Sequence, residues 1–202
     1  DTLIILGDFG FLWDGGKKEQ KTLKKLAKLK YTVLFLDGTH ENFDLLNRFP
    51  VTEWNGGKVH ILEENVIHLI RGQVYTIEYE KYFVFGGGES LDHDMRTQGE
   101  TWWEEEMPSG EEMIQGRRCL KEHDNKMNYI LTHEYPGRSA CYLDKGGREN
   151  GVNAYLGLSE NEVEYDRWFF GSLHTDKILS KRLIAVFQKI IPVHPPKKKI
   201  RK

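Results

Sequence analysis

Four short apolar runs in this sequence each end in a turn that carries a residue able to bind a metal ion. Short apolar runs closed by glycine or threonine are typical of buried β-strands. Ligands of α/β sheets bind beyond the carboxyl ends of the strands, where side chains from distant parts of a sequence meet. The runs are Leu3–Leu6, Tyr31–Leu36, Tyr129–Leu131 and Trp168–Phe170, and the turns after them carry Asp8, His40, His133 and His174.

The other expected elements indicate a layered α/β fold. Leucine recurs every third residue among the lysines of Lys17–Lys30, which predicts an amphipathic helix. Ser109 and Glu112 have the spacing of a capping box at the start of another helix. The close-spaced strands in the middle of the sequence favour antiparallel or mixed pairing that continues into a second sheet. We expect helices at Lys17–Lys30, Asn42–Asn47, Glu100–Met107 and Ser109–Glu122; further strands at Val66–Ile70, Val74–Glu78, Tyr82–Gly86 and Arg182–Ile190; and a long loop over Pro136–Glu160.

Composition places the chain among globular proteins. With 202 residues, 39% hydrophobic and 30% charged, it is long enough for one domain with a proper core. No apolar run approaches the roughly 18 residues of a membrane span, and the first residues lack the pattern of a secretory signal. The two cysteines, Cys119 and Cys141, form no CxxC pair, which favours a reducing, cytoplasmic setting over a disulfide framework.

The formal charge of −2 conceals a basic end of the chain. Pro192–Lys202 carries five lysines or arginines and no acid. We therefore expect a domain over residues 1–191, followed by a disordered, solvated tail over residues 192–202. The same tail could instead bind nucleic acid or an acidic surface.

The residues after the four strands have the chemistry of a metal site. Imidazole and carboxylate together suit zinc, manganese and iron. Two such ions about 3.5–4 Å apart activate water near neutral pH and stabilise a phosphoryl group during transfer. Each residue alone has a simpler explanation, because a histidine after a strand is usually a surface or capping residue and Gly-Asp is a common turn. The joint pattern favours the metal site.

The order of these motifs resembles the signature of the calcineurin-like metallophosphoesterases, and the closer match is to small bacterial and phage members of that family. The resemblance runs from residue 1 to about residue 191. It implies a four-layer α/β/β/α sandwich with mixed sheets. The matching stretches are Gly7–Trp13, Asp37–Asp44, Leu69–Tyr75 and Thr132–Pro136.

The resemblance implies a role for each residue that follows a strand. Asp8 would be the catalytic carboxylate that bridges both metals. His174 would bind the first metal and His133 the second. His40 would be the catalytic imidazole, which protonates the leaving group or stabilises the phosphate. The expected cofactor is a pair of divalent ions, with manganese, iron, zinc and nickel all compatible with such ligands.

The resemblance implies less about substrate contacts than about metal ligands. The substrate implied is a phosphate-containing molecule. The resemblance implies that Arg71 and Arg96 could contact it. The Trp102-Trp103 pair could also contact substrate, although tryptophan pairs are more often part of a core.

Three features depart from the family signature. The upstream Asp-x-His motif is absent from the sequence, Thr39 stands where the family has asparagine, and Ser172 stands where the family has histidine. Neutral hydroxyls are weak ligands compared with imidazole. Each ion would keep two strong ligands where the family has four, so we expect weak occupancy. The absent upstream strand also predicts an unpaired edge beside the strand that precedes Asp8.

Two functions stay open at this point. The first is a metal-dependent enzyme that hydrolyses a phosphomonoester or phosphodiester through metal-bound hydroxide. The second is a non-catalytic module of the same fold that binds a phosphate ligand, nucleic acid or a protein. The resemblance favours the first, and Thr39 and Ser172, together with the absent motif, are the features that would favour the second if the native gene also carries them. A shortened chain would account for the absent motif, but the two substitutions fall on ligands of the same metal and favour natural degeneration or deliberate alteration.

Overall fold

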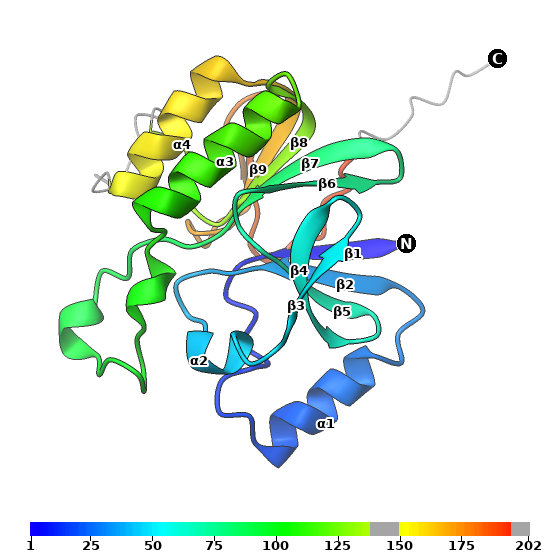
Figure 1. Cartoon of the computed structure of the whole chain (residues 1–202), viewed down its shortest axis with the longest axis vertical. Coiled ribbons are helices and arrows are strands. Elements are labelled where there is room, and N and C mark those ends of the chain that lie inside the picture. The colour runs from blue at the N-terminus through cyan, green and yellow to red at the C-terminus, as the bar shows by residue number, and fades with distance from the viewer. Residues whose placement is uncertain (138–149, 195–202) are drawn as a thin grey trace.

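The structure, a computed structural model, describes residues 1–137 and 150–194. Among these residues, strands form two mixed sheets that are flanked by helices (Figure 1), which confirms an α/β fold. The helices are α1 (Lys17–Leu26), α2 (Phe43–Leu46), α3 (Gly110–Glu122) and α4 (Gly151–Glu162), with 3₁₀ helices η1 (His93–Met95) and η2 (Glu104–Glu106).

The first sheet contains, among the described residues, five strands in the order β1-β2-β5-β4-β3. They are β1 (Thr2–Leu6), β2 (Thr32–Leu36), β5 (Val66–Leu69), β4 (Gly57–Glu63) and β3 (Val51–Trp54). The neighbours β1, β2 and β5 are parallel, whereas β4 and β3 pair antiparallel. The parallel half brings the carboxyl ends of β1 and β2 to the same edge of the sheet.

The second sheet contains six described strands in the order β10-β11-β9-β8-β7-β6. They are β10 (Lys177–Ile178), β11 (Leu183–Ala185), β9 (Glu164–Phe170), β8 (Lys126–Thr132), β7 (Glu80–Phe85) and β6 (Gln73–Ile77). The central strands β7, β8, β9 and β11 are parallel, and an antiparallel strand closes each end. The carboxyl ends of β8 and β9 therefore also lie together.

Three clusters of buried apolar side chains hold these elements in place. One cluster combines residues of both sheets, such as Leu34 of β2 and Leu131 of β8, so the sheets pack against each other. Another joins the six-stranded sheet to α3 and α4 and includes Leu156. The third joins the five-stranded sheet to α1 and α2 and includes Leu23 and Phe43.

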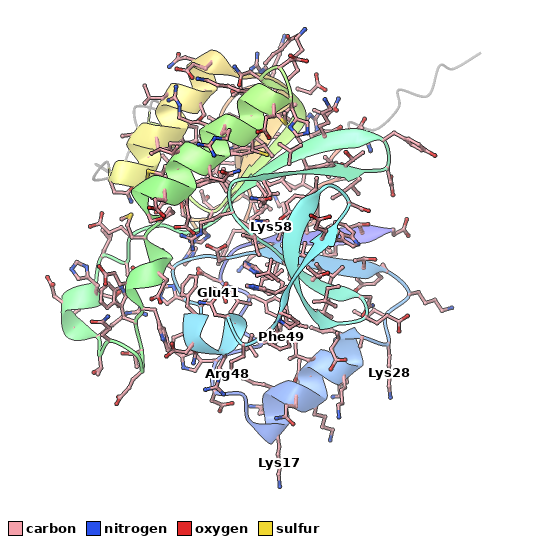
Figure 2. All side chains as sticks on the ribbon, in the orientation of Figure 1. Lys17, Lys28, Glu41, Arg48, Phe49 and Lys58 are labelled. Atoms are coloured by element: carbon pink, nitrogen blue, oxygen red, sulfur yellow. The ribbon has the colours of Figure 1, made fainter. Side chains whose placement is uncertain are left out.

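Helix α1 is shorter than Lys17–Lys30, because the regular helix ends at Leu26 and continues only as turns. Its leucines pack on the five-stranded sheet, and its lysines project outward, as Figure 2 shows for Lys17. The capping box expected at Ser109 and Glu112 is present at the start of α3.

The long loop predicted over Pro136–Glu160 is wrong in its last part, where α4 begins at Gly151. Residues 138–149 of that segment lie outside the described residues. Asn150 and Asn153 form a capping box, with asparagine in place of the usual serine and glutamate. Glycine and serine lower the helix propensity of this segment, but burial of Val152, Tyr155 and Leu156 favours the helix through tertiary packing.

Two other predicted elements are shorter than expected. Glu100–Met107 is not an α-helix and contains only the 3₁₀ turn η2, because Trp102 pairs with Gln98 and Trp103 is buried. The strand predicted over Arg182–Ile190 ends at Ala185. After it, the Asp176 carboxylate accepts hydrogen bonds from the next loop's backbone N–H groups and directs the chain away from the sheet. Strands β3, β4 and β10 were not predicted from the sequence.

Strand β1 lies at an open edge of its sheet. Within the described residues it pairs only with β2. Its apolar residues Leu3–Leu6 are half-buried, although a run of this kind predicts a fully buried strand. Beside them lies a cleft of about 400 Å³, lined among others by Phe169 and Val186. Among the described residues, this is the unpaired edge expected beside the strand that precedes Asp8.

The end of the described chain reaches past the predicted domain boundary at residue 191. Val193 packs against the core between the sheets, and the His194 Nδ1 atom lies 3.0 Å from the Tyr129 hydroxyl. The basic residues of the predicted tail, 197–202, lie outside the described residues, as does Cys141, while Cys119 is a free thiol. No described helix is long and apolar enough to cross a bilayer.

Candidate metal centre

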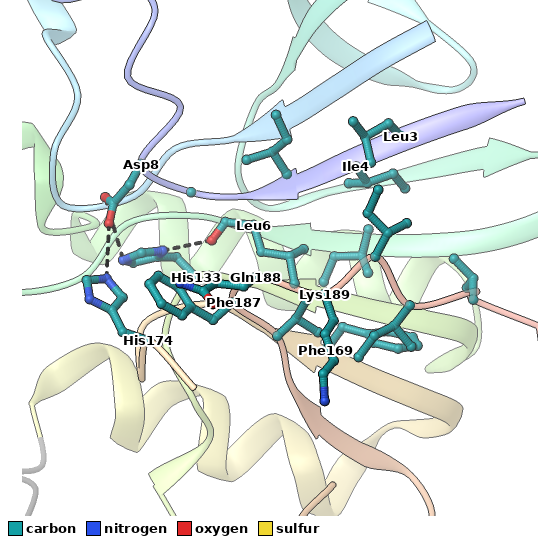
Figure 3. Close-up of a pocket in the computed structure, with 18 of the residues that line it drawn as sticks. Leu3, Ile4, Leu6, Asp8, His133, Phe169, His174, Phe187, Gln188 and Lys189 are labelled. Carbon is teal, nitrogen blue, oxygen red and sulfur yellow. Dashed lines mark hydrogen bonds and ion pairs between the residues drawn. The ribbon is translucent and has the colours of Figure 1, made fainter. Parts of the chain in front are cut away.

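The four turns that follow β1, β2, β8 and β9 meet between the two sheets. Their side chains surround the carboxylate of Asp8, as Figure 3 shows for His133 and His174. His40 Nδ1 lies 3.4 Å and His133 Nε2 3.9 Å from Asp8 Oδ1, and His174 Nε2 lies 3.7 Å from Asp8 Oδ2. Four positions that are far apart in the sequence therefore form one cluster.

Two residues of this cluster have an uncommon backbone conformation, and two glycines let their turns approach each other. Asp8 (φ 54°) and His174 (φ 47°) both adopt the left-handed conformation, which is uncommon for residues with a side chain. A Cβ atom at Gly7 would collide with the His133 ring, and one at Gly38 would collide with the Asp8 carboxylate. Glycine at these positions lets the turns approach each other closely.

Asp8 is held as an anion. Its Oδ1 atom accepts the backbone N–H groups of Thr39 (3.1 Å) and His40 (3.0 Å). Burial raises the pKa of this carboxyl, but the hydrogen bond with His40 and the electrostatic interactions with the imidazoles of His133 and His40 hold its pKa well below the usual range. A carboxylate that stays charged in a half-buried site is suited to bind cations.

The hydrogen bond of His133 fixes which of its ring nitrogens can act as a ligand. Its Nδ1 atom lies 2.8 Å from the Leu6 carbonyl oxygen, which can only accept, so Nδ1 carries the proton. In the neutral ring Nε2 then has a free lone pair, and it points at the Asp8 carboxylate. Metal-binding histidines in proteins commonly donate their second N–H to a backbone carbonyl in this way. A lone pair facing a carboxylate indicates a place for a cation.

The donor atoms fit a divalent ion in kind and spacing but not in number. Two donors about 2.1 Å from one zinc ion at the tetrahedral angle lie about 3.4 Å apart, close to the 3.7 Å and 3.9 Å that separate Asp8 from His174 and His133. Among residues 1–137 and 150–194, however, no group of three or more His, Cys, Asp or Glu side chains is already arranged to hold a metal ion. Catalytic zinc sites use three protein ligands, so each ion would lack at least one.

His40 and Arg96 form a pair at the open side of the cluster. The Arg96 Nη2 atom lies 2.6 Å from His40 Nε2 and 2.8 Å from Asp92 Oδ2. Because a guanidinium group can only donate, His40 Nε2 accepts and its proton sits on Nδ1. The hydrogen bond to Asp8 raises the pKa of His40, whereas burial and Arg96 lower it. A second proton at Nε2 therefore requires Arg96 to move away.

The hydroxyl groups of Thr39 and Ser172 contact residues other than Asp8. Thr39 Oγ1 lies 2.9 Å from His40 Nδ1, and Ser172 donates to Glu134 Oε2 at 3.2 Å. Glu134 also accepts from Asn153 Nδ2 at 3.1 Å. Neither Glu134 nor Asn153 was predicted to belong to the site; Glu134 directly follows a predicted ligand, but no sequence pattern indicates Asn153.

The cluster opens into a cleft of about 370 Å³. Arg96 lines this cleft together with His40 and His174, so it can reach a ligand beside Asp8. Arg71 does not line it. Its guanidinium is 5% exposed and pairs with the buried Asp37 carboxylate at the floor of a separate cleft of about 800 Å³.

Neither tryptophan of the Trp102-Trp103 pair lines the cleft at Asp8. Trp103 is buried, its indole N–H donates to Asp44 Oδ2 at 2.9 Å, and its ring packs on Trp13. Trp102 lies beside the ring of His93. Trp103 thus follows the more common pattern of a core tryptophan.

Glu41 joins the two loops that carry Asp8 and His40. Its Oε1 atom accepts the backbone N–H groups of Phe9 (2.9 Å) and Gly38 (3.3 Å). Burial raises the pKa of Glu41 to about 8, although the hydrogen bonds from these two N–H groups lower it. The folded protein therefore binds this proton more tightly than the unfolded chain, whose carboxyl has a pKa near 4.5. The stability that this proton supplies is complete below pH 4.5 and is lost as the pH rises towards 8.

We expect Glu41→Gln to raise the free energy of unfolding at pH 8 by about 4 kcal/mol, because glutamine keeps the acceptor oxygen and never ionises. At pH 4.5 the variant and the original protein should have equal stability. Urea unfolding at both pH values, with chelator present, measures the difference. A Glu63→Gln variant, altered at a partly exposed glutamate, should show no such pH dependence. A stability difference for Glu41→Gln that does not change with pH would contradict the raised pKa.

No protein-family model matches the chain, and no curated protein matches it significantly.

Proposed function

We propose that this chain has the fold and the activity type of a metallophosphoesterase, a hydrolase that uses divalent ions to cleave a phosphate ester. The observation that carries the proposal is the Asp8 carboxylate, which faces the imidazoles of His133 and His174 from another sheet. The tautomer of His133 supports it, because a free Nε2 lone pair is suited to a cation. The substrate would be a phosphomonoester or a phosphodiester.

We further propose a four-layer α/β/β/α arrangement. The three apolar clusters support it, since one lies between the sheets and one on the outer side of each sheet, beneath helices. In this arrangement the functional side chains follow parallel strands of both sheets, which is where ligands of α/β folds bind.

Each residue of the cluster has a distinct task in this proposal. Asp8, His133 and His174 would hold the ions, which activate water and neutralise the charge on phosphoryl oxygens when bound. Arg96 would bind a phosphate oxygen, because its planar group donates several hydrogen bonds in a fixed geometry. When Arg96 turns to the substrate, His40 Nε2 becomes free to take a proton and give it to the leaving oxygen.

The test is hydrolysis of bis(p-nitrophenyl) phosphate and p-nitrophenyl phosphate by protein loaded with manganese or zinc, with bound metal counted by mass spectrometry. We expect bound metal and slow turnover that EDTA removes and added metal restores. Two ligands per ion predict loss of metal during gel filtration without added metal. Bound metal without turnover of either ester would refute the hydrolase but not the metal site.

The alternative function is a non-catalytic module that binds a phosphate ligand, nucleic acid or a protein. Thr39 and Ser172 favour it, because their hydroxyls contact His40 and Glu134 and leave the ions short of ligands. The Thr39→Asn/Ser172→His variant separates the two functions. If the present chain binds no metal and this variant gains both metal and turnover, the alternative holds for the chain as it stands. If the chain already turns over, the variant should only raise its metal affinity.

A further inference from the structure

The outward side of α1 and of the turn that follows it carries lysines without acidic partners. The one acid in residues 17–30, Glu19, turns its carboxylate inward and accepts the backbone N–H groups of Trp13, Asp14 and Gly15 at 2.8–3.0 Å. No described carboxylate lies within 4 Å of any lysine of the segment. All seven are exposed, namely Lys17, Lys18, Lys21, Lys24, Lys25, Lys28 and Lys30.

Four of these lysines form a straight row. Lys17, Lys21 and Lys24 follow one another at intervals of three or four residues, which places them on one side of α1. Lys28 continues the same spacing in the turn that follows the helix. At 1.5 Å per residue the row is about 16 Å long. Like charges at these intervals repel each other and weaken the helix. Figure 2 shows Lys17 and Lys28 at the two ends of this row, directed away from the protein.

The charge of residues 17–30, which contain the row, differs in sign from that of the chain as a whole. Seven lysines and one glutamate give residues 17–30 a formal charge of +6, whereas the whole chain has −2, which leaves −8 for the other 188 residues. A positive surface on an otherwise acidic protein orients it towards a polyanion and speeds their encounter.

The apolar side of α1 is already in use. Leu23 is buried, and Leu26 and Leu29 pack against the cluster on the five-stranded sheet. A helix that lies in a membrane interface needs a free apolar side to insert below the headgroups, and α1 has none. Lysine is a compact point charge that contacts phosphate without fixed geometry. The row therefore suits a regular line of phosphates better than a lipid surface.

We propose that the lysine row of α1 binds the phosphate backbone of a nucleic acid, without base specificity. A row of about 16 Å covers the rise of about five phosphates along one strand of duplex DNA, at 3.4 Å each. The lysines would neutralise phosphates and release counterions, so binding would weaken steeply with salt. This inference does not depend on hydrolysis, because binding can be measured with the metal removed.

The test is fluorescence anisotropy of a labelled 20-base-pair duplex in EDTA, over a series of salt concentrations. The test variant replaces the row by glutamine, K17Q/K21Q/K24Q/K28Q, which keeps helix propensity. Since each phosphate contact contributes about 0.9 to the slope of log K against log salt, we expect a slope shallower by about 3 to 4. The control, K58Q/K121Q/K126Q/K181Q, removes the same charge from exposed lysines elsewhere and should change the slope by less than 1.

Three results would overturn the proposal. The original protein could fail to bind the duplex at low salt. The two quadruple variants could bind the duplex with equal affinity, which would mean that net charge or the basic C-terminal residues, present in both, account for the affinity. Poly-glutamate or phosphatidylserine vesicles could bind the row as tightly as DNA of equal charge, which would assign it to an acidic protein or a membrane. Circular dichroism of both variants checks that the fold is retained.

Discussion

Replacing Asp8 by asparagine is expected to lower the affinity for manganese or zinc at least about 100-fold and to abolish metal-dependent hydrolysis. Loss of a group that only supports a metal ligand typically costs 10- to 100-fold in metal affinity, and Asp8 would be a ligand shared by both ions. Asparagine can still accept the N–H groups of Thr39 and His40. It cannot supply the negative charge that faces His133 and His174. Isothermal titration with metal measures the affinity, and release of nitrophenol measures the rate.

The matched control for Asp8→Asn is Asp124→Asn. Asp124 also has a left-handed backbone, with φ of 58° against 54° for Asp8, so both substitutions meet the same conformational demand. Asparagine tolerates this conformation. The control should bind metal and hydrolyse ester as the original protein does. If Asp8→Asn kept its metal affinity, the ions would have to bind elsewhere, and the proposed function would lose its main support.

The sequence predicted the parts of the fold whose local signals agree with their environment. The strands before Asp8 and His40 are apolar, short and closed by turns, and β1 and β2 lie there. The capping box of α3 was predictable because Ser109 and Glu112 act within one turn of helix. Helix α4 was not, because its stability comes from burial of Val152, Tyr155 and Leu156 against the second sheet rather than from its own propensity.

In the candidate site too, some residues are predictable from local sequence signals and others depend on distant contacts. Convergence of Asp8, His40, His133 and His174 follows from their shared position after parallel strands, and a single sequence displays that position. Arg96 lies in an irregular segment, 56 residues from its contact His40, so no periodic pattern predicts this contact. Their roles in metal binding and catalysis stay predictions until the experiments on Asp8 are done.

Arg71 lay within a matching stretch and was expected to contact substrate, but its position depends on a buried partner. Its guanidinium pairs with Asp37, whose side chain is 1% exposed, and donates to the Glu105 carbonyl at 3.0 Å. His68 Nε2 lies 3.1 Å from the other Asp37 oxygen. Burial raises the pKa of Asp37, but the charge of Arg71 and the hydrogen bond of His68 together outweigh burial and lower that pKa to about 2. Removal of the guanidinium would leave a buried carboxylate without its cation.

We therefore expect Arg71→Met to lower the free energy of unfolding by about 3–5 kcal/mol at pH 7, the typical cost of breaking a buried ion pair from one side. In the double variant Asp37→Asn/Arg71→Met no charge is left buried, and asparagine keeps an acceptor for His68, so at least half of the loss should be regained. Urea unfolding of both variants measures these differences. The KM for the nitrophenyl esters should stay unchanged in Arg71→Met, because Arg71 does not line the cleft at Asp8.

The pH dependence of the same variant gives an independent check. In the original protein the Asp37 pKa is below its unfolded value of 3.8, so the stability from this group is present above pH 3.8 and lost as the pH falls towards 2. In Arg71→Met, burial without the cation should raise the Asp37 pKa above 3.8, and the stability from its proton is then lost as the pH rises. The stability gap between the two proteins should therefore narrow as the pH is lowered from 7 to 4.5. A gap that stays constant would mean that Arg71 acts through packing on Phe43, the ring beneath its guanidinium, rather than through its charge.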